Sequence, residues 1–132
     1  GGAISRALIS YPGSSQFFKA GIVAYSVESK IHILGIPKKF IKENGAISME
    51  TSMEMARKSK KLSKSDYSIS STGYADPSDS LAGTVFICIC GKKGEYLTRL
   101  QIKKKSRDEI ISEATRNAMD FLYKVIRKET LG

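Results

Sequence analysis

The feature that most restricts the fold is an uninterrupted apolar run, Val85-Phe86-Ile87-Cys88-Ile89-Cys90. A strand that lacks polar alternation is typically buried on both faces. Gly91-Lys92-Lys93-Gly94 follows as a turn, and Glu95 to Ile102 is predicted to return as the second strand of a hairpin. The chain must therefore supply helices that cover both faces of a sheet.

Helical periodicity identifies those covering elements. Helices are expected at Ala3 to Ile9, Glu28 to Leu34, Pro37 to Glu43, Met49 to about Leu62, and from Ser106 or Asp108 to near the last residue. Ser48 is the expected N-cap of the fourth. Further strands are expected at Phe17 to Tyr25, with Ile22, Val23 and Ala24 as its buried part, and at Tyr67 to Ser71. This order predicts an α/β fold with a mixed sheet between helices.

The two cysteines, Cys88 and Cys90, fall inside the apolar run. Alternate residues of a strand share a face, but their Cα atoms lie too far apart for an easy disulfide. His32 is the only histidine, so a metal site would lack ligands. We expect both thiols to act as small apolar residues, unreactive and without metal.

The length of 132 residues predicts a single domain, residues 1–132. No apolar run approaches the roughly 20 residues that span a bilayer, and no basic and apolar leader opens the chain. We therefore expect no membrane contact and a cytoplasmic location.

The net charge of +9 raises the alternative of a basic nucleic-acid-binding module. The basic residues gather between Arg57 and Lys64, at Lys92-Lys93, and at Lys103-Lys104-Lys105. No aromatic residues interleave with these runs, and no zinc-finger, RRM or KH motif is present. A solvated basic face is the preferred interpretation, and nucleic acid is not an expected partner.

Several short motifs occur in a fixed order along the chain. They are Gly1-Gly2, Pro12-Gly13-Ser14-Ser15, Tyr25-Ser26-Val27-Glu28-Ser29-Lys30, Gly45-Ala46-Ile47-Ser48, Thr72-Gly73-Tyr74-Ala75-Asp76-Pro77 and Gly83-Thr84-Val85. In this order and at nearly this spacing they resemble the C-terminal domain of the CinA family, whose pattern is S-C-T-G-G, P-G-S-S, Y-S-N-x-x-K, G-A-V-S, T-G-I-A-G-P and V-G-T-V. The resemblance covers almost the whole chain.

The resemblance implies a three-layer α/β/α sandwich and an amidohydrolase without a metal or organic cofactor. Its members hydrolyse the carboxamide of nicotinamide mononucleotide to nicotinate mononucleotide and ammonia. By position, Tyr25 and Lys30 match the catalytic tyrosine and lysine that assist a serine nucleophile. The substrate-binding positions are Gly1, Gly2, Thr72, Gly73 and Arg107. The implied ligand is a pyridine nucleotide or a related anionic small molecule.

The chain departs from the family pattern at several positions. The serine of S-C-T-G-G would precede Gly1, Val27 replaces an asparagine, and Asp76 replaces a glycine of the ligand loop. Of the family's F-x-G-D-R, only Arg107 is kept. We therefore expect the chain as it stands to be inactive. The alternative is a non-catalytic relative that binds a ligand or forms a homo-oligomer.

Overall fold

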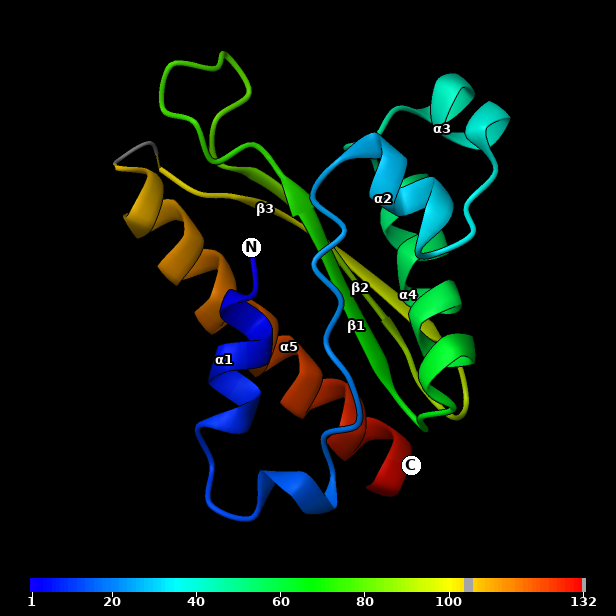
Figure 1. The fold of residues 1–132 in the computed structure, drawn as a ribbon. Coiled ribbons are helices and arrows are strands. Elements are labelled where there is room, and N and C mark those ends of the chain that lie inside the picture. Colours follow the sequence, from blue (N-terminus) through cyan, green and yellow to red (C-terminus); the bar gives the residue numbers. More distant parts are fainter. Residues whose placement is uncertain (104–105, 132) are drawn as a thin grey trace.

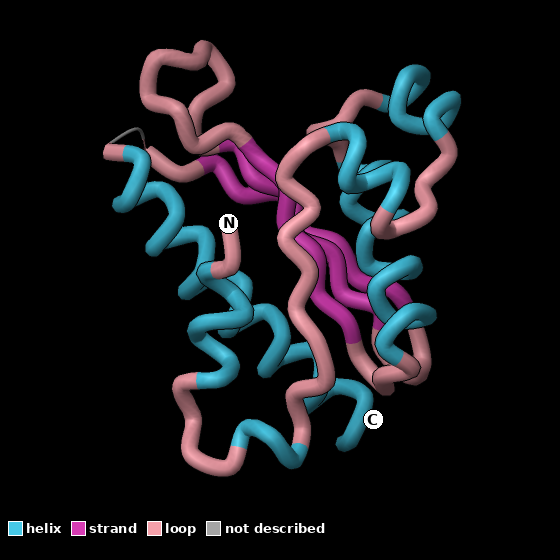
Figure 2. Tube along the Cα trace, in the orientation of Figure 1, coloured by secondary structure: helices cyan, strands magenta, loops and turns pink. Residues whose placement is uncertain are grey.

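The computed structural model describes residues 1–103 and 106–131 and has the predicted α/β class (Figure 1). The elements are α1 (Ala3–Ile9), the short 3-10 helix η1 (Ser14–Gln16), α2 (Val27–His32), α3 (Lys38–Asn44), α4 (Met49–Ser63), β1 (Ser68–Gly73), β2 (Thr84–Cys90), β3 (Glu95–Gln101) and α5 (Arg107–Leu131). Figure 2 shows the strands lying between two groups of helices.

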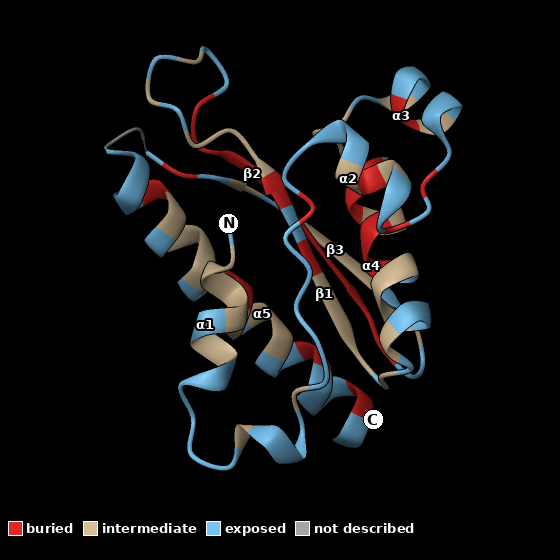
Figure 3. Cartoon of the chain, viewed as in Figure 1, coloured by how far each residue is buried: buried red, intermediate tan, exposed pale blue. Residues whose placement is uncertain are grey.

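The apolar run forms the central strand of the sheet. The strand order is β1-β2-β3, and both pairs are antiparallel. Ile87, Cys88 and Ile89 of β2 are fully buried. Figure 3 shows buried residues concentrated along the sheet and α4. Burial on both faces of β2 explains why its sequence shows no polar alternation.

Helices cover both faces of the sheet, which confirms the three-layer arrangement. On one face, Ala56 of α4 packs with Cys88. On the other, Ile110 and Ala118 of α5 pack with Ile87, and α1 also contacts α5. Both cysteines are therefore enclosed under α4, and both are free thiols.

The strand predicted from Phe17 to Tyr25 is wrong. The segment has no strand pairing; Ile22 and Val23 are 36% and 53% exposed, while only Ala24 of its predicted core is buried. An apolar run becomes a strand only where a neighbouring backbone accepts and donates hydrogen bonds. Within the described part of the chain, the sheet is consequently antiparallel throughout rather than mixed.

The remaining elements agree with the sequence to within a few residues. The Ser48 N-cap is confirmed, because its hydroxyl accepts a hydrogen bond of 3.1 Å from the Thr51 N–H. Helix α5 begins at Arg107, between the two expected starting residues. Glycine allows the positive φ of 90° at Gly2, where α1 begins without a side-chain cap.

The far end of α5 is attached to the hairpin turn by one buried carboxylate. Glu129 accepts hydrogen bonds from the N–H groups of Lys92 (2.8 Å) and Lys93 (3.1 Å) and from the Tyr96 hydroxyl (2.9 Å). Burial opposes the charge of Glu129, but these bonds and one from Tyr67 outweigh burial and lower its pKa to about 2. Glu129 and the groups that donate hydrogen bonds to it are called the carboxylate clasp below.

Candidate functional site

Two of the predicted site residues meet although 82 positions separate them. The Arg107 guanidinium, at the start of α5, donates a hydrogen bond of 3.2 Å to the Tyr25 hydroxyl. Tyr25 is 73% exposed and Arg107 is also exposed. An exposed guanidinium supported by a phenol can donate charge-assisted hydrogen bonds to an anion such as phosphate.

Lys30 is the opposite case, since its side chain is buried with only 5% exposed. Its Nζ donates a hydrogen bond of 2.7 Å to the carbonyl of Ala24, and no carboxylate pairs with it among the contacts of the described residues. Burial lowers the pKa of the Lys30 ammonium. An amine with a lowered pKa has a larger neutral fraction and can accept a proton from a nucleophile.

The local sequence fixes Lys30 in place through the start of α2. Ser26 and Ser29 form a reciprocal capping box: each hydroxyl accepts a hydrogen bond of 3.0 Å from the other residue's N–H. Our sequence reasoning missed this box, although the Ser-x-x-Ser spacing before a helix could have indicated it. The cap sets the direction of α2 and so turns Lys30 back towards Ala24.

Three consecutive residues, Val23 to Tyr25, carry the contacts of the site. A Cβ placed on Gly2 would lie 3.7 Å from Val23 Cγ2, so Gly2 packs against Val23. Lys30 bonds Ala24 and Arg107 bonds Tyr25. The structure thus brings Gly2, Tyr25, Lys30 and Arg107 to one short extended segment, with Gly1 adjacent in sequence.

The structure does not bring Thr72 and Gly73 into contact with those residues. Thr72 is buried, and its hydroxyl donates to the Ala46 carbonyl at 3.3 Å. Gly73 pairs with Val85, and a Cβ there would lie 2.7 Å from the Thr84 carbonyl oxygen. Both residues therefore have structural roles at the end of β1, and their part in binding remains a prediction.

The Asp76 side chain, in the loop that follows β1, is held by hydrogen bonds within that loop. The Asp76 carboxylate accepts hydrogen bonds from the Ser78 N–H (2.9 Å) and the Ser78 hydroxyl (2.8 Å). This arrangement is a local aspartate turn. Asp76 therefore helps to shape the loop between β1 and β2.

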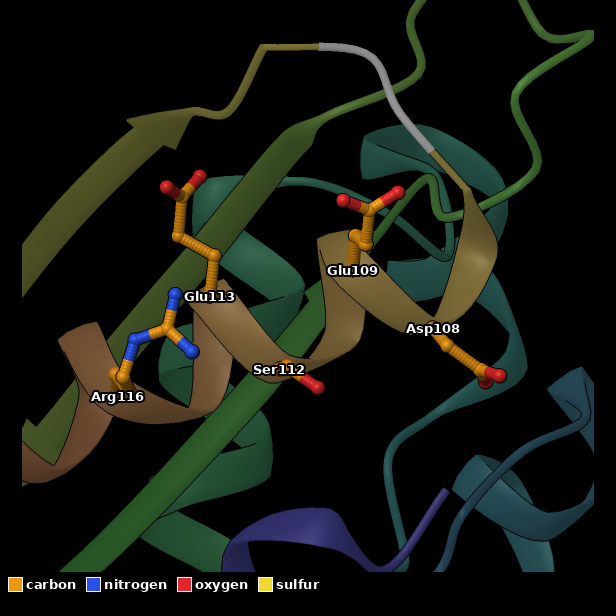
Figure 4. Close-up of a pocket in the computed structure, with 5 residues that line it drawn as sticks. All are labelled: Asp108, Glu109, Ser112, Glu113 and Arg116. Carbon is orange, nitrogen blue, oxygen red and sulfur yellow. The ribbon is translucent and has the colours of Figure 1, made fainter.

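A depression of about 270 Å³ lies along the first turns of α5 (Figure 4). Its lining residues are Asp108, Glu109, Ser112, Glu113 and Arg116. Three carboxylates against one guanidinium would repel an anionic ligand. The depression therefore does not suit a nucleotide phosphate.

The described ranges contain neither a metal-binding cluster nor a helix that could span a membrane. Residues 1–103 and 106–131 contain no cluster of three histidine, cysteine, aspartate or glutamate side chains that could hold a metal ion. None of the helices in these ranges has the length and apolarity needed to cross a bilayer.

The Cys88 thiol has a raised pKa, through its hydrogen bond with Cys90 and through burial.

Several basic side chains are engaged within the protein. Arg57 pairs with Glu54 at 2.8 Å and Glu95 at 2.6 Å, and Lys60 donates to the Gly91 carbonyl at 2.7 Å. Lys103 is exposed, whereas Lys104 and Lys105 lie outside the described residues. Two residues of the first basic cluster are thus engaged within the protein, which favours a solvated surface over a nucleic-acid interface.

Known proteins resemble this chain in sequence and in fold. A CinA-like protein of Shewanella piezotolerans is 36% identical over 99% of the chain, and the nicotinamide-nucleotide amidohydrolase PncC of Shewanella oneidensis is 33% identical. The chain spans only 32% of the length of either relative. A crystal structure of a competence or damage-inducible protein from Enterobacter asburiae superimposes with a TM-score of 0.89 at 26% identity, covering 95% of this chain and 80% of that one. The model of the CinA C-terminal domain matches residues 1–126, and the chain therefore belongs to the CinA C-terminal domain family.

Proposed function

We propose that this domain binds nicotinamide mononucleotide, or a closely related pyridine nucleotide, beside Val23 to Tyr25. The supporting observation is the convergence of Gly2, Lys30 and Arg107 on those three residues. Arg107 and Tyr25 would contact the phosphate, and Lys30 would lie nearer the carboxamide. Thr72, Gly73 and Gly1 belong to the same site by resemblance alone.

The family reaction proposed for this site is carboxamide hydrolysis. A nucleophile loses its proton and attacks the carboxamide carbon, the C–N bond breaks, and the nitrogen takes up that proton and leaves as ammonia; water then hydrolyses the acyl intermediate to the acid. Lys30 would accept the nucleophile's proton, a role that its lowered pKa favours. No metal or organic cofactor enters this proposal.

For the 132-residue chain itself we propose binding without turnover. The resemblance puts the nucleophilic serine in the S-C-T stretch that would precede Gly1. Ser5 is a poor substitute, because its side chain lies against Gly21, where an added Cβ would collide with it. One domain over residues 1–132, a cytoplasmic location and a homo-oligomer remain further predictions.

An NMR titration with nicotinamide mononucleotide tests the binding proposal. Amide shifts should gather around Gly2, Lys30, Gly73 and Arg107, and shifts confined to the surroundings of Lys103 would contradict it. Arg107→Gln should weaken binding by about tenfold, the loss expected for one charge-assisted contact. Arg116→Gln, a matched change further along α5, should leave the affinity unchanged.

An ammonia assay tests the proposal of binding without turnover. The purified chain incubated with the nucleotide should release no ammonia above background. Turnover that Lys30→Ala abolishes would show that a nucleophile is present elsewhere and that the proposal of inactivity is wrong.

A further inference from the structure

Helix α5 carries an apolar row on the side that faces away from the sheet. Its inner side buries Ile110 and Val125 in the core. On the outer side, Tyr123 is 60% and Ile126 is 38% exposed, and Met119 is half-buried. These three positions follow the i, i+4, i+7 spacing of a single helix face. They therefore form one strip, which we call the outer row of α5.

Two depressions on α5 have opposite charges. The first, at the start of the helix, is lined by three carboxylates and one guanidinium (Figure 4). The second, of about 400 Å³, is lined by three cations and a leucine, namely Lys124, Arg127, Lys128 and Leu131. Met119 lies between the two depressions along the helix. The surface of α5 is therefore acidic before Met119 and basic beyond it.

The spacing of these charges suits an antiparallel pair of α5 helices. At about 1.5 Å per residue, Glu113 lies about 9 Å before Met119 and Arg127 about 12 Å beyond it. At about 100° per residue, both side chains also project on the same side of the outer row. Antiparallel packing brings like sides of two helices together, so Glu113 of each copy would lie opposite Arg127 of the other.

We propose that α5 forms the contact between two copies of this chain, related by a two-fold axis that passes beside Met119. The outer rows would meet at the centre, and two Glu113–Arg127 ion pairs would flank them. A two-fold contact uses one patch twice, so the patch must be its own complement. The divided charge of α5 meets that requirement. The inference concerns the outer side of α5 and does not rest on the proposed nucleotide chemistry.

A second copy fits this surface better than a partner of uniform charge. An acidic or a basic partner would be attracted to one half of α5 and repelled by the other. Because a single helix of each copy carries the contact, the dimer should be weak, with a dissociation constant of about 10–100 µM. Salt screens exposed ion pairs, so added salt should weaken the association further.

Two charge reversals test the dimer by sedimentation equilibrium. Glu113→Lys or Arg127→Glu alone places like charges opposite one another in both flanking pairs, and either should weaken self-association by at least about tenfold. Mixing the two variants should restore a dimer, because the two altered side chains then face each other and the unaltered ones also pair. Glu43→Lys, at an exposed glutamate of α3, is the matched control and should associate like the unmodified chain.

Three outcomes would overturn the proposal. One is an unmodified chain that stays monomeric at concentrations up to about 1 mM. Another is a dimer that withstands either reversal. The third is a mixture that remains monomeric although circular dichroism shows both variants to be folded. Tyr123→Ser supplies a second variant in the exposed outer row, and it should also reduce self-association.

Discussion

Residues 84–131 and residues 1–25 contain similar apolar side chains, but the first region buries many of them and the second buries almost none. In the first region, three successive residues of β2 are fully buried and the carboxylate clasp fixes the end of α5. In the second, α1 contains no buried residue and Ala24 alone is buried. The difference shows that burial depends on a paired neighbour rather than on local hydrophobicity.

The largest expected effect is a cavity in the first region. Ile87→Ala should lower the free energy of unfolding by about 2–5 kcal/mol, because Ile87 is fully enclosed between two helical layers. Ile22→Ala in the second region should cost less than about 0.5 kcal/mol. Urea unfolding of both variants measures the contrast, and equal losses would contradict it.

Removing the charge of Glu129 in the carboxylate clasp should have the next largest effect on stability. The folded pKa of Glu129, about 2, lies below its ordinary value of 4.5. The ionised group therefore contributes stability above pH 4.5, and this contribution is lost as the pH falls towards 2. Glu129→Gln should lower the melting temperature at neutral pH and flatten its fall with acid. Glu43→Gln, at an exposed pair, is the control and should retain the wild-type acid profile.

A smaller loss is expected at the cap of α4. Ser48→Ala removes the acceptor for the Thr51 N–H and should cost about 1 kcal/mol of stability. Ser10→Ala, at the exposed end of α1, should change stability by less than about 0.5 kcal/mol. Thermal unfolding compares the two, and a larger loss at Ser10 would show that α1 is better anchored than its exposure indicates.

The smallest effect on stability is expected at Tyr25. Tyr25→Phe removes the exposed hydroxyl that meets Arg107 and should change stability by less than about 0.5 kcal/mol. Nucleotide affinity should nevertheless fall, as measured by calorimetry. Unaltered affinity would remove the phenol from the proposed site.

Local patterns in the sequence predicted most of the elements. Apolar periodicity placed α1 with its observed bounds, and the uninterrupted apolar run placed β2 to within one residue, because both patterns depend on neighbouring residues. The prediction of a strand from Phe17 to Tyr25 was wrong, because strand pairing depends on residues far away in the sequence. The Tyr25–Arg107 contact had no local signal, and the family resemblance named both residues without predicting that they meet. The role of Glu129 was missed because a glutamate at a helix end normally faces solvent.

The carboxylate clasp also sets an order of events during synthesis. The turn at Lys92 and Lys93 is translated well before its acceptor, since Lys92 and Glu129 are 37 positions apart. Until Glu129 has left the ribosome, the N–H groups of Lys92 and Lys93 can bond only to water. The end of α5 therefore cannot yet dock on the hairpin turn. Contacts of such long range form late and slow the folding of a chain. The growing polypeptide therefore completes the central hairpin first and closes the α5 layer over it only after Glu129 has emerged.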